Sequence, residues 1–287
     1  MKRISIACVV MAVLPGLARA GDDAGVLLNK ALDELARTGS VGDTSSAERY
    51  LRAALEQEPG NLEAQWQLLH IQLLPLKNVD LYARTQALSE LSPEFERLGQ
   101  LAKKSGQEGF LHYMTATHAG YYDAYERALG EIDRAVALDR TSVRYLTAKG
   151  RLLVGSGKWT RNDAQVEEGI GVLHQARELW QTHPSIFVRD EFFEFYLADA
   201  FSSFEHPRWA EAAEHYERFL EKAQESALTA FAWNNLSIAY RKTGSCDRAR
   251  NAATKALTIM TFGAAQTNKV YADFCLEMQK SGVMAKN

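Results

Sequence analysis

Apolar residues recur at every third or fourth position along most of this chain, and the alternation typical of strands is scarce. This spacing puts apolar side chains on one face of a helix, so it predicts an all-α protein without a sheet. The first predicted helix follows Asp22 and ends at Thr38 and Gly39. Its apolar positions are Val26, Leu27, Ala31, Leu32, Leu35 and Ala36.

Turn residues divide the first hundred residues into further predicted helices. A helix around Leu51 leads to a turn at Pro59, and a helix from residue 62 ends before Pro75. Between residues 79 and 106, Ser92 and Pro93 are typical of a helix cap followed by a first-turn proline. We therefore expect two short helices in that segment.

The middle and end of the chain continue the same pattern. Helices are predicted around residues 110–119 and 128–135, and the next helix is expected to turn at Gly157. An insertion at residues 160–168 is expected to delay its partner helix. An aromatic segment from 187 to 219 then predicts a fifth hairpin, and residues 269–278 predict a terminal capping helix.

One stretch, residues 233–256, carries an almost complete repeat signature. Large, small and turn residues fall at fixed offsets: Trp233, Leu236, Ser237, Tyr240, Gly244, Ala249, Ala253 and Ala256. By this signature the chain resembles the tetratricopeptide-repeat (TPR) superfamily. The resemblance is strong in this hairpin, moderate in three others and weak from Lys77 to Gln107. It implies a right-handed solenoid of five to six irregular helix pairs, with a concave face that binds a peptide, a protein segment or another subunit.

The first twenty residues are typical of a secretory signal. Lys2 and Arg3 precede an apolar run, and Ala18-Arg19-Ala20 provides a small-residue cleavage site. The alternative is an uncleaved anchor or a buried first helix. We expect cleavage after Ala20, a single domain over residues 21–287, no membrane span in the mature chain, and a periplasmic or secreted location.

Composition and charge change this picture little. The chain has 287 residues, of which 46% are hydrophobic and 24% charged, so it has enough apolar residues to form a core. Its formal charge of -3 predicts that it lacks the basic surface of nucleic-acid binders. After signal cleavage, two cysteines remain, Cys246 and Cys275. In a stack of hairpins these two can meet, which predicts a disulfide in an oxidising compartment; separately buried thiols are the alternative.

The resemblance implies that residues on the first helix of each hairpin line the concave face. Amides next to cations could receive a carboxylate or an extended backbone, whereas an ordinary solvated surface is the plain alternative. Asn235 matches one asparagine of the carboxylate-clamp version of the family, but the other clamp positions are not filled. The candidate partner-binding residues are Asn234, Asn235, Arg241, Lys242, Arg144, Thr147, Arg151, Tyr113 and Glu194.

Motifs for other functions are missing from the sequence. The seven histidines form no recognisable metal-ligand spacing, and neither a nucleophile elbow nor a phosphate-binding loop is present. We therefore expect no enzyme activity, no metal and no cofactor. The aromatic run of the fifth hairpin is predicted to be mainly core, with a ligand-binding platform as the alternative.

These observations favour a protein-binding or peptide-binding adaptor or assembly factor of the bacterial cell envelope. The alternative is a small-molecule or lipid-binding component of an envelope transport system, with a cavity near the fifth hairpin. An enzyme on a helical solenoid is a third hypothesis, because a fold alone does not exclude catalysis.

Overall fold

The computed structural model describes residues 23–38 and 43–282, and in these ranges it contains thirteen α-helices, one short 3₁₀ helix and no strand. The predicted all-α fold is confirmed. The predicted signal segment lies outside the described residues. The helices are α1 (Ala24–Thr38), α2 (Ser45–Gln57), α3 (Leu62–Leu73), α4 (Leu81–Lys104), α5 (Glu108–Tyr121), α6 (Tyr125–Leu138), α7 (Val143–Thr160), α8 (Asp163–Thr182), α9 (Asp190–Phe201), α10 (Trp209–Lys222), α11 (Ala227–Lys242), α12 (Cys246–Ile259) and α13 (Gly263–Lys280).

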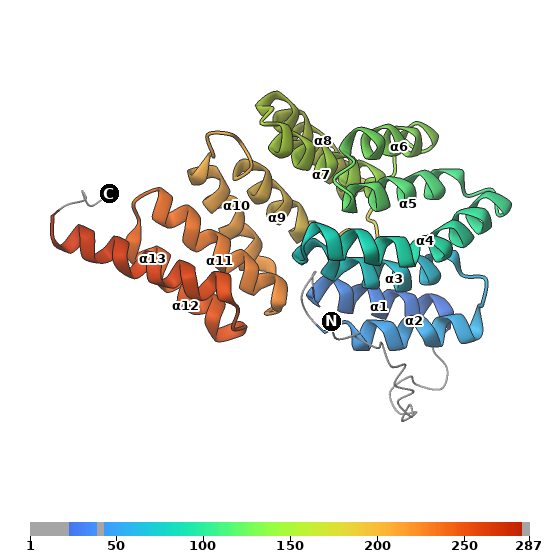
Figure 1. Cartoon of the computed structure of the whole chain (residues 1–287), viewed down its shortest axis with the longest axis horizontal. Helices are drawn as coiled ribbons and strands as arrows, with labels where there is room; N and C mark the ends of the chain where they lie inside the picture. The colour runs from blue at the N-terminus through green and yellow to red at the C-terminus, as the bar shows by residue number, and fades with distance from the viewer. Residues whose placement is uncertain (1–22, 39–42, 283–287) are drawn as a thin grey trace.

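Consecutive helices pack in pairs, and the pairs stack into a solenoid (Figure 1). Six pairs, from α1 with α2 to α11 with α12, are followed by α13 at the end of the stack. The predicted helical-hairpin solenoid with a capping helix is therefore confirmed. None of the helices in the described ranges is long and apolar enough to cross a membrane.

The last full hairpin forms as its signature predicts. Leu236 and Tyr240 on α11 are almost fully buried in a core that also includes alanines of α12. Gly244 ends α11 with a φ of 81°, a left-handed conformation that glycine adopts without a steric penalty. A disulfide joins Cys246 at the start of α12 to Cys275 on α13, which confirms the predicted pair.

Two expectations for the fourth hairpin were wrong. Gly157 lies inside α7, which continues to Thr160, and not at a turn. A Cβ at this position would come within 2.8 Å of the Val166 backbone nitrogen of α8. The glycine thus allows close approach of two helices. The turn is formed by Arg161, with a φ of 55°, and Asn162 caps α8. There is no insertion between the helices, since α8 already begins at Asp163.

The prediction of two short helices in residues 79–106 was also wrong, because α4 runs without a break through Pro93. Proline lacks a backbone N–H and so removes one hydrogen bond of the helix. Leu88 on one side and Leu98 and Ala102 on the other are all fully buried in one core. This shared apolar contact on both sides of the proline keeps the helix continuous.

The first helices of the stack return to the later ones. Helix α1 contacts α11, and Asp33 of α1 lies 3.8 Å from Arg189 at the start of α9. Glu63 of α3 pairs with Arg144 of α7, eighty-one residues further along the chain. The inner side of the solenoid is therefore crossed by its own side chains at some levels, and these contacts decide which residues can meet a partner.

Candidate binding face on the inner side of the solenoid

Helix α7 presents Arg144, Thr147 and Arg151 along one face, since residues three and four apart lie on the same side of a helix. Contacts of the two arginines identify what this face meets. Arg144 reaches Glu63 of α3, and Arg151 lies over the ring of Tyr196 on α9. The face therefore points to the inner side of the stack, between the first helices of several hairpins. The structure brings these three predicted residues together.

Arg144 forms an ion pair within the scaffold. Its two terminal nitrogens lie 2.6 and 3.0 Å from the two carboxylate oxygens of Glu63, a bidentate pair. The guanidinium is covered by Tyr113 at 4.1 Å and by Phe187, from the loop between α8 and α9, at 4.2 Å. Only 8% of Arg144 is exposed. A partner cannot reach this cation without opening the bridge.

Arg151, two turns further along α7, is exposed. Its guanidinium stacks at 4.6 Å from the centre of the Tyr196 ring. In the described part of the chain, no carboxylate oxygen lies within 4 Å of it. Arg151 therefore makes no close ion pair in the described residues, and the carboxylate of Asp199 acts on its charge only from a longer distance.

Thr147 lies one turn before Arg151 and is only 4% exposed, yet its hydroxyl has no hydrogen-bond partner among the described residues. A buried hydroxyl without a partner loses the hydrogen bonds that it makes in water, at a cost of about 1–3 kcal/mol. Tyr113 of α5 is half-buried and stacks on Tyr145 at the start of α7. This level of the face thus holds one buried hydroxyl without a hydrogen-bond partner among the described residues, next to a stacked pair of tyrosines.

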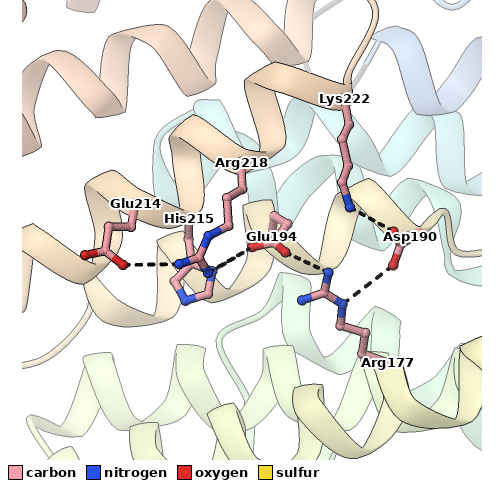
Figure 2. A network of polar contacts seen from close by, with 7 residues as sticks. All are labelled: Arg177, Asp190, Glu194, Glu214, His215, Arg218 and Lys222. Carbon is pink, nitrogen blue, oxygen red and sulfur yellow. Dashed lines mark hydrogen bonds and ion pairs between the residues drawn. The ribbon is translucent and has the colours of Figure 1, made fainter.

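Glu194 occupies a different place from the one predicted. It is buried between helices, 2.7 Å from Arg177 of α8 and 2.8 Å from His215 of α10, as Figure 2 shows. Ala198, one turn later and fully buried, marks the side of α9 that packs closest to its neighbours. Because Glu194 shares that side, it lies within the helix layers and not on the open inner surface.

The charges of this network stabilise the packing of α8, α9 and α10. Burial acts to raise the pKa of Glu194, but hydrogen bonds from His215 and Arg177 outweigh it and hold the pKa below the usual value. Burial lowers the pKa of His215, against the opposing effect of Glu194. A neutral imidazole therefore donates to a charged carboxylate. Asp190 extends the network by ion pairs with Arg177 and Lys222 (Figure 2).

The two predicted amides of α11 are also engaged internally. Asn234 is buried and donates to the side chain of Asn235 over 3.2 Å, while it accepts from Asn268 of α13 over 2.9 Å. Asn235 donates to the hydroxyl of Tyr216 on α10 over 3.1 Å. This ladder of amides connects α10, α11 and α13, so neither asparagine offers a free donor pair to a ligand.

Arg241 and Lys242, at the end of α11, remain accessible to solvent. Arg241 is half-exposed and lies over the ring of Tyr271 of α13 at 5.3 Å. Within the described residues, neither cation has a carboxylate oxygen within 4 Å. They lie on the last hairpin, apart from the face around Arg151.

Sequence reasoning missed Glu63, Tyr196 and Phe187, which decide how each arginine of α7 is used. Their contacts join helices of different hairpins, so no local spacing could reveal them. Tyr196 stood in the aromatic run of α9, where rings occur on every side of the helix. In the described ranges, no group of three acidic, histidine or cysteine side chains is placed to hold a metal ion.

Comparison with known proteins gives the class of this fold. No family model matches the chain, and no curated protein matches it. The structure of yeast Tom70 aligns with 90% of this chain at a TM-score of 0.56 and 12% identity. The chain thus has a TPR-like fold, as predicted, and it spans about half of Tom70, 48% of that chain.

Two further structures are similar at lower scores. A tetratricopeptide repeat protein from Parabacteroides merdae aligns with a TM-score of 0.45 and 17% identity, covering 88% of this chain and 99% of its own. The TPR domain of P58(IPK) aligns with a TM-score of 0.35 and 16% identity, covering 90% and 80%.

Proposed function

We propose that this protein is a non-enzymatic scaffold that holds a segment of a partner protein against the inner side of its solenoid, at the level of Arg151. The observation that carries the proposal is the exposed side chain of Arg151, whose guanidinium stacks on Tyr196 and has no carboxylate oxygen within 4 Å in the described residues. An acidic side chain or a terminal carboxylate of a bound segment supplies the missing anion, by the forked geometry that arginine favours.

The surroundings of Arg151 suit a peptide. The rings of Tyr196 and Tyr113 offer flat, rigid surface, which binds well at a low cost in side-chain entropy. Hydrogen bonds to charged groups contribute about 1.5–3 kcal/mol each, so Arg151 can dominate the affinity of such a site.

The cellular setting is part of the same proposal. The signal-like residues 1–20 and the disulfide between Cys246 and Cys275 support an exported protein, because disulfides persist in oxidising compartments. We place the mature protein, a single domain from residue 21 to 287, in the bacterial periplasm or outside the cell. There it acts as an adaptor or assembly factor.

The alternative, a lipid or small-molecule carrier, receives less support. Phe193 and Phe201 of α9 are buried in two different cores, and the other rings of this helix pack against the core that contains Phe201. A hollow of about 460 Å³ lies between α2, α3 and α4, and one of about 340 Å³ lies at the start of α9, lined there by Asp190 and Glu191. None of the aromatic side chains of α9 lines either hollow. The fifth hairpin thus uses its aromatic residues chiefly for packing.

A crosslinking pull-down tests the proposal. The tagged protein is expressed in its native cells, crosslinked and purified, and captured proteins are quantified for the wild type and for Arg151→Gln. We expect one dominant partner, lost in Arg151→Gln and partly recovered in Arg151→Lys. Arg140→Gln, which removes an exposed arginine between α6 and α7, serves as the matched control. Equal recovery with Arg151→Gln would show that the inner face at this level is not the binding site.

A further inference from the structure

The outer face of the last helix, α13, is unusually apolar. Val270, Tyr271 and Phe274 are 64%, 52% and 59% exposed. Phe274 is a helical neighbour of both other side chains, since it lies four residues after Val270 and three after Tyr271. Terminal helices of solenoids normally present a polar outer face, because nothing stacks on them. Among the described residues, no helix packs over these three side chains, although the guanidinium of Arg241 lies 5.3 Å from the centre of the Tyr271 ring.

The repeat spacing explains why they are there. Leu236 and Tyr240 of α11 are almost fully buried in a core shared with Ala249 of α12. Thirty-four residues later, the length of one repeat, the chain has Val270 and Phe274. These two residues of α13 thus occupy the positions that α11 uses to bind its second helix. Helix α13 is built as the first helix of a hairpin, but its counterpart to α12 is not among the described elements.

Helix α13 is also held rigidly in place. The disulfide from Cys275 to Cys246 fixes its middle, and the side chain of Gln279 donates to the Gly244 carbonyl over 2.7 Å near its end. Asn268 donates to Asn234 of α11 nearer its start. An apolar surface that is already fixed loses little entropy when a partner binds.

Two cations next to this apolar face favour an acidic partner. Arg241 lies over Tyr271, at the edge of the apolar face, and Lys242 follows it. Neither has a carboxylate partner within 4 Å in the described part of the chain. Carboxylates on an incoming segment would complement both cations, and they would also be attracted over a longer distance than apolar contact allows.

We propose that an amphipathic, acidic helix of a partner protein packs on Val270, Tyr271 and Phe274 and completes the seventh hairpin in trans. The partner helix differs from α12 in one respect. Tyr271 stands where α11 has the small Ser237, so the helix lies further from α13 and covers the ring. This surface is independent of the inner face around Arg151, and either can exist without the other.

The test uses second helices of this chain as probes, because they already complete hairpins in this fold. A fluorescent peptide with the sequence of residues 209–222, in which carboxylates outnumber cations, is compared with one of residues 246–259, in which cations dominate and Cys246 is replaced by serine. Binding to the full chain is measured by fluorescence anisotropy. We expect the acidic peptide to bind more tightly, and Val270→Ser with Phe274→Ser to weaken it by about ten-fold or more.

Two controls make the result decisive. Leu81→Ser with Tyr82→Ser removes exposed apolar side chains at the start of α4 and is expected to leave binding unchanged. Circular dichroism and the melting temperature establish that each variant folds. Equal binding by wild type and the Val270/Phe274 variant, or equal binding of the two peptides, would overturn the proposal. So would a wild-type dimer, seen by light scattering, that the same substitutions dissociate, since a second copy would then cover the face.

Discussion

Arg144 and Arg151 lie on the same face of α7, yet the fold uses them in opposite ways. Arg144 is paired with Glu63, covered by Phe187 and nearly inaccessible. Arg151 is exposed and has an aromatic ring but no carboxylate within 4 Å in the described residues. At Arg144 an ion pair crosses the inner side of the solenoid and blocks access, whereas at Arg151 no ion pair crosses it.

The difference shows that position on a helix face does not decide whether a charge can bind a partner. What decides it is the chain that lies opposite, which for Arg144 comes from α3 and from the loop before α9. A buried ion pair that loses one member is costly, whereas an exposed cation contributes little to stability. The two levels should therefore respond very differently to the same substitution.

The largest effect is expected where the inner side is closed. Glu63→Ala leaves the guanidinium of Arg144 buried without its partner, which should lower the free energy of unfolding by about 3–5 kcal/mol. Urea denaturation followed by circular dichroism measures the loss. The pair variant Glu63→Ala with Arg144→Met should recover much of it, because no buried charge remains. A loss below 1 kcal/mol for the single change would mean that the bridge does not close the stack.

The disulfide between α12 and α13 is a second contact that should stabilise the fold, at the end of the stack. Cys246→Ser with Cys275→Ser opens a loop of 29 residues, and chain entropy predicts a loss of about 3 kcal/mol. Differential scanning calorimetry of this variant, and of the wild type with and without reductant, provides the measurement. Reductant should not change the variant. If the melting temperatures of variant and wild type coincide, the disulfide does not stabilise α13.

A partly buried histidine provides a smaller contrast, since its protonation is coupled to the stability of the scaffold. His118 of α5 stacks on Phe95 of α4, and burial, followed by nearby Arg127, lowers its pKa from 6.5 to about 4. Below pH 6.5 the unfolded chain binds this proton and the folded chain does not, so stability falls as the pH drops from 6.5 to 4. The loss should be about 2 kcal/mol, discounted for partial exposure.

The measurement for His118 is the urea midpoint as a function of pH, compared between the wild type and His118→Gln. The amide keeps the shape of the site but takes up no proton. We expect the difference between the two curves to change between pH 6.5 and 4 and to be constant above that window. Parallel curves throughout would assign the acid sensitivity to other groups.

The smallest effect on stability is expected at the open level. Arg151→Gln removes an exposed charge that makes no ion pair. The free energy of unfolding, measured by urea denaturation, should therefore change by no more than about 0.5 kcal/mol. Tyr196→Phe provides a check, because it keeps the ring on which Arg151 stacks and should also leave the free energy of unfolding unchanged. A loss of several kcal/mol for Arg151→Gln would place this arginine among the structural ones.

Much of the fold was predictable because it depends on local periodicity. The hairpins, the turn at Gly244 and the disulfide follow from residues near one another in sequence or one repeat apart. The course of α4 through Pro93 was not predictable, since buried leucines on both sides outweigh a local break signal. The face of α9 was ambiguous because rings surround Glu194 on both sides in the sequence.

The candidate site was predictable only in part, and for a related reason. Spacing alone places Arg144, Thr147 and Arg151 on one face of a helix. Whether each is engaged depends on Glu63, Phe187 and Tyr196, whose positions follow from how the whole stack curves. Sequence reasoning therefore gave a list of candidates, and the structure separates those held by the scaffold from those that face solvent.

The most direct test measures stability and partner capture side by side for Arg144→Gln and Arg151→Gln. The account predicts that Arg144→Gln lowers the urea midpoint markedly, while Arg151→Gln leaves the midpoint unchanged and abolishes capture. If Arg151→Gln captured the partner as the wild type does, or unfolded as easily as Arg144→Gln, the division between a closed and an open level of the inner face would be contradicted.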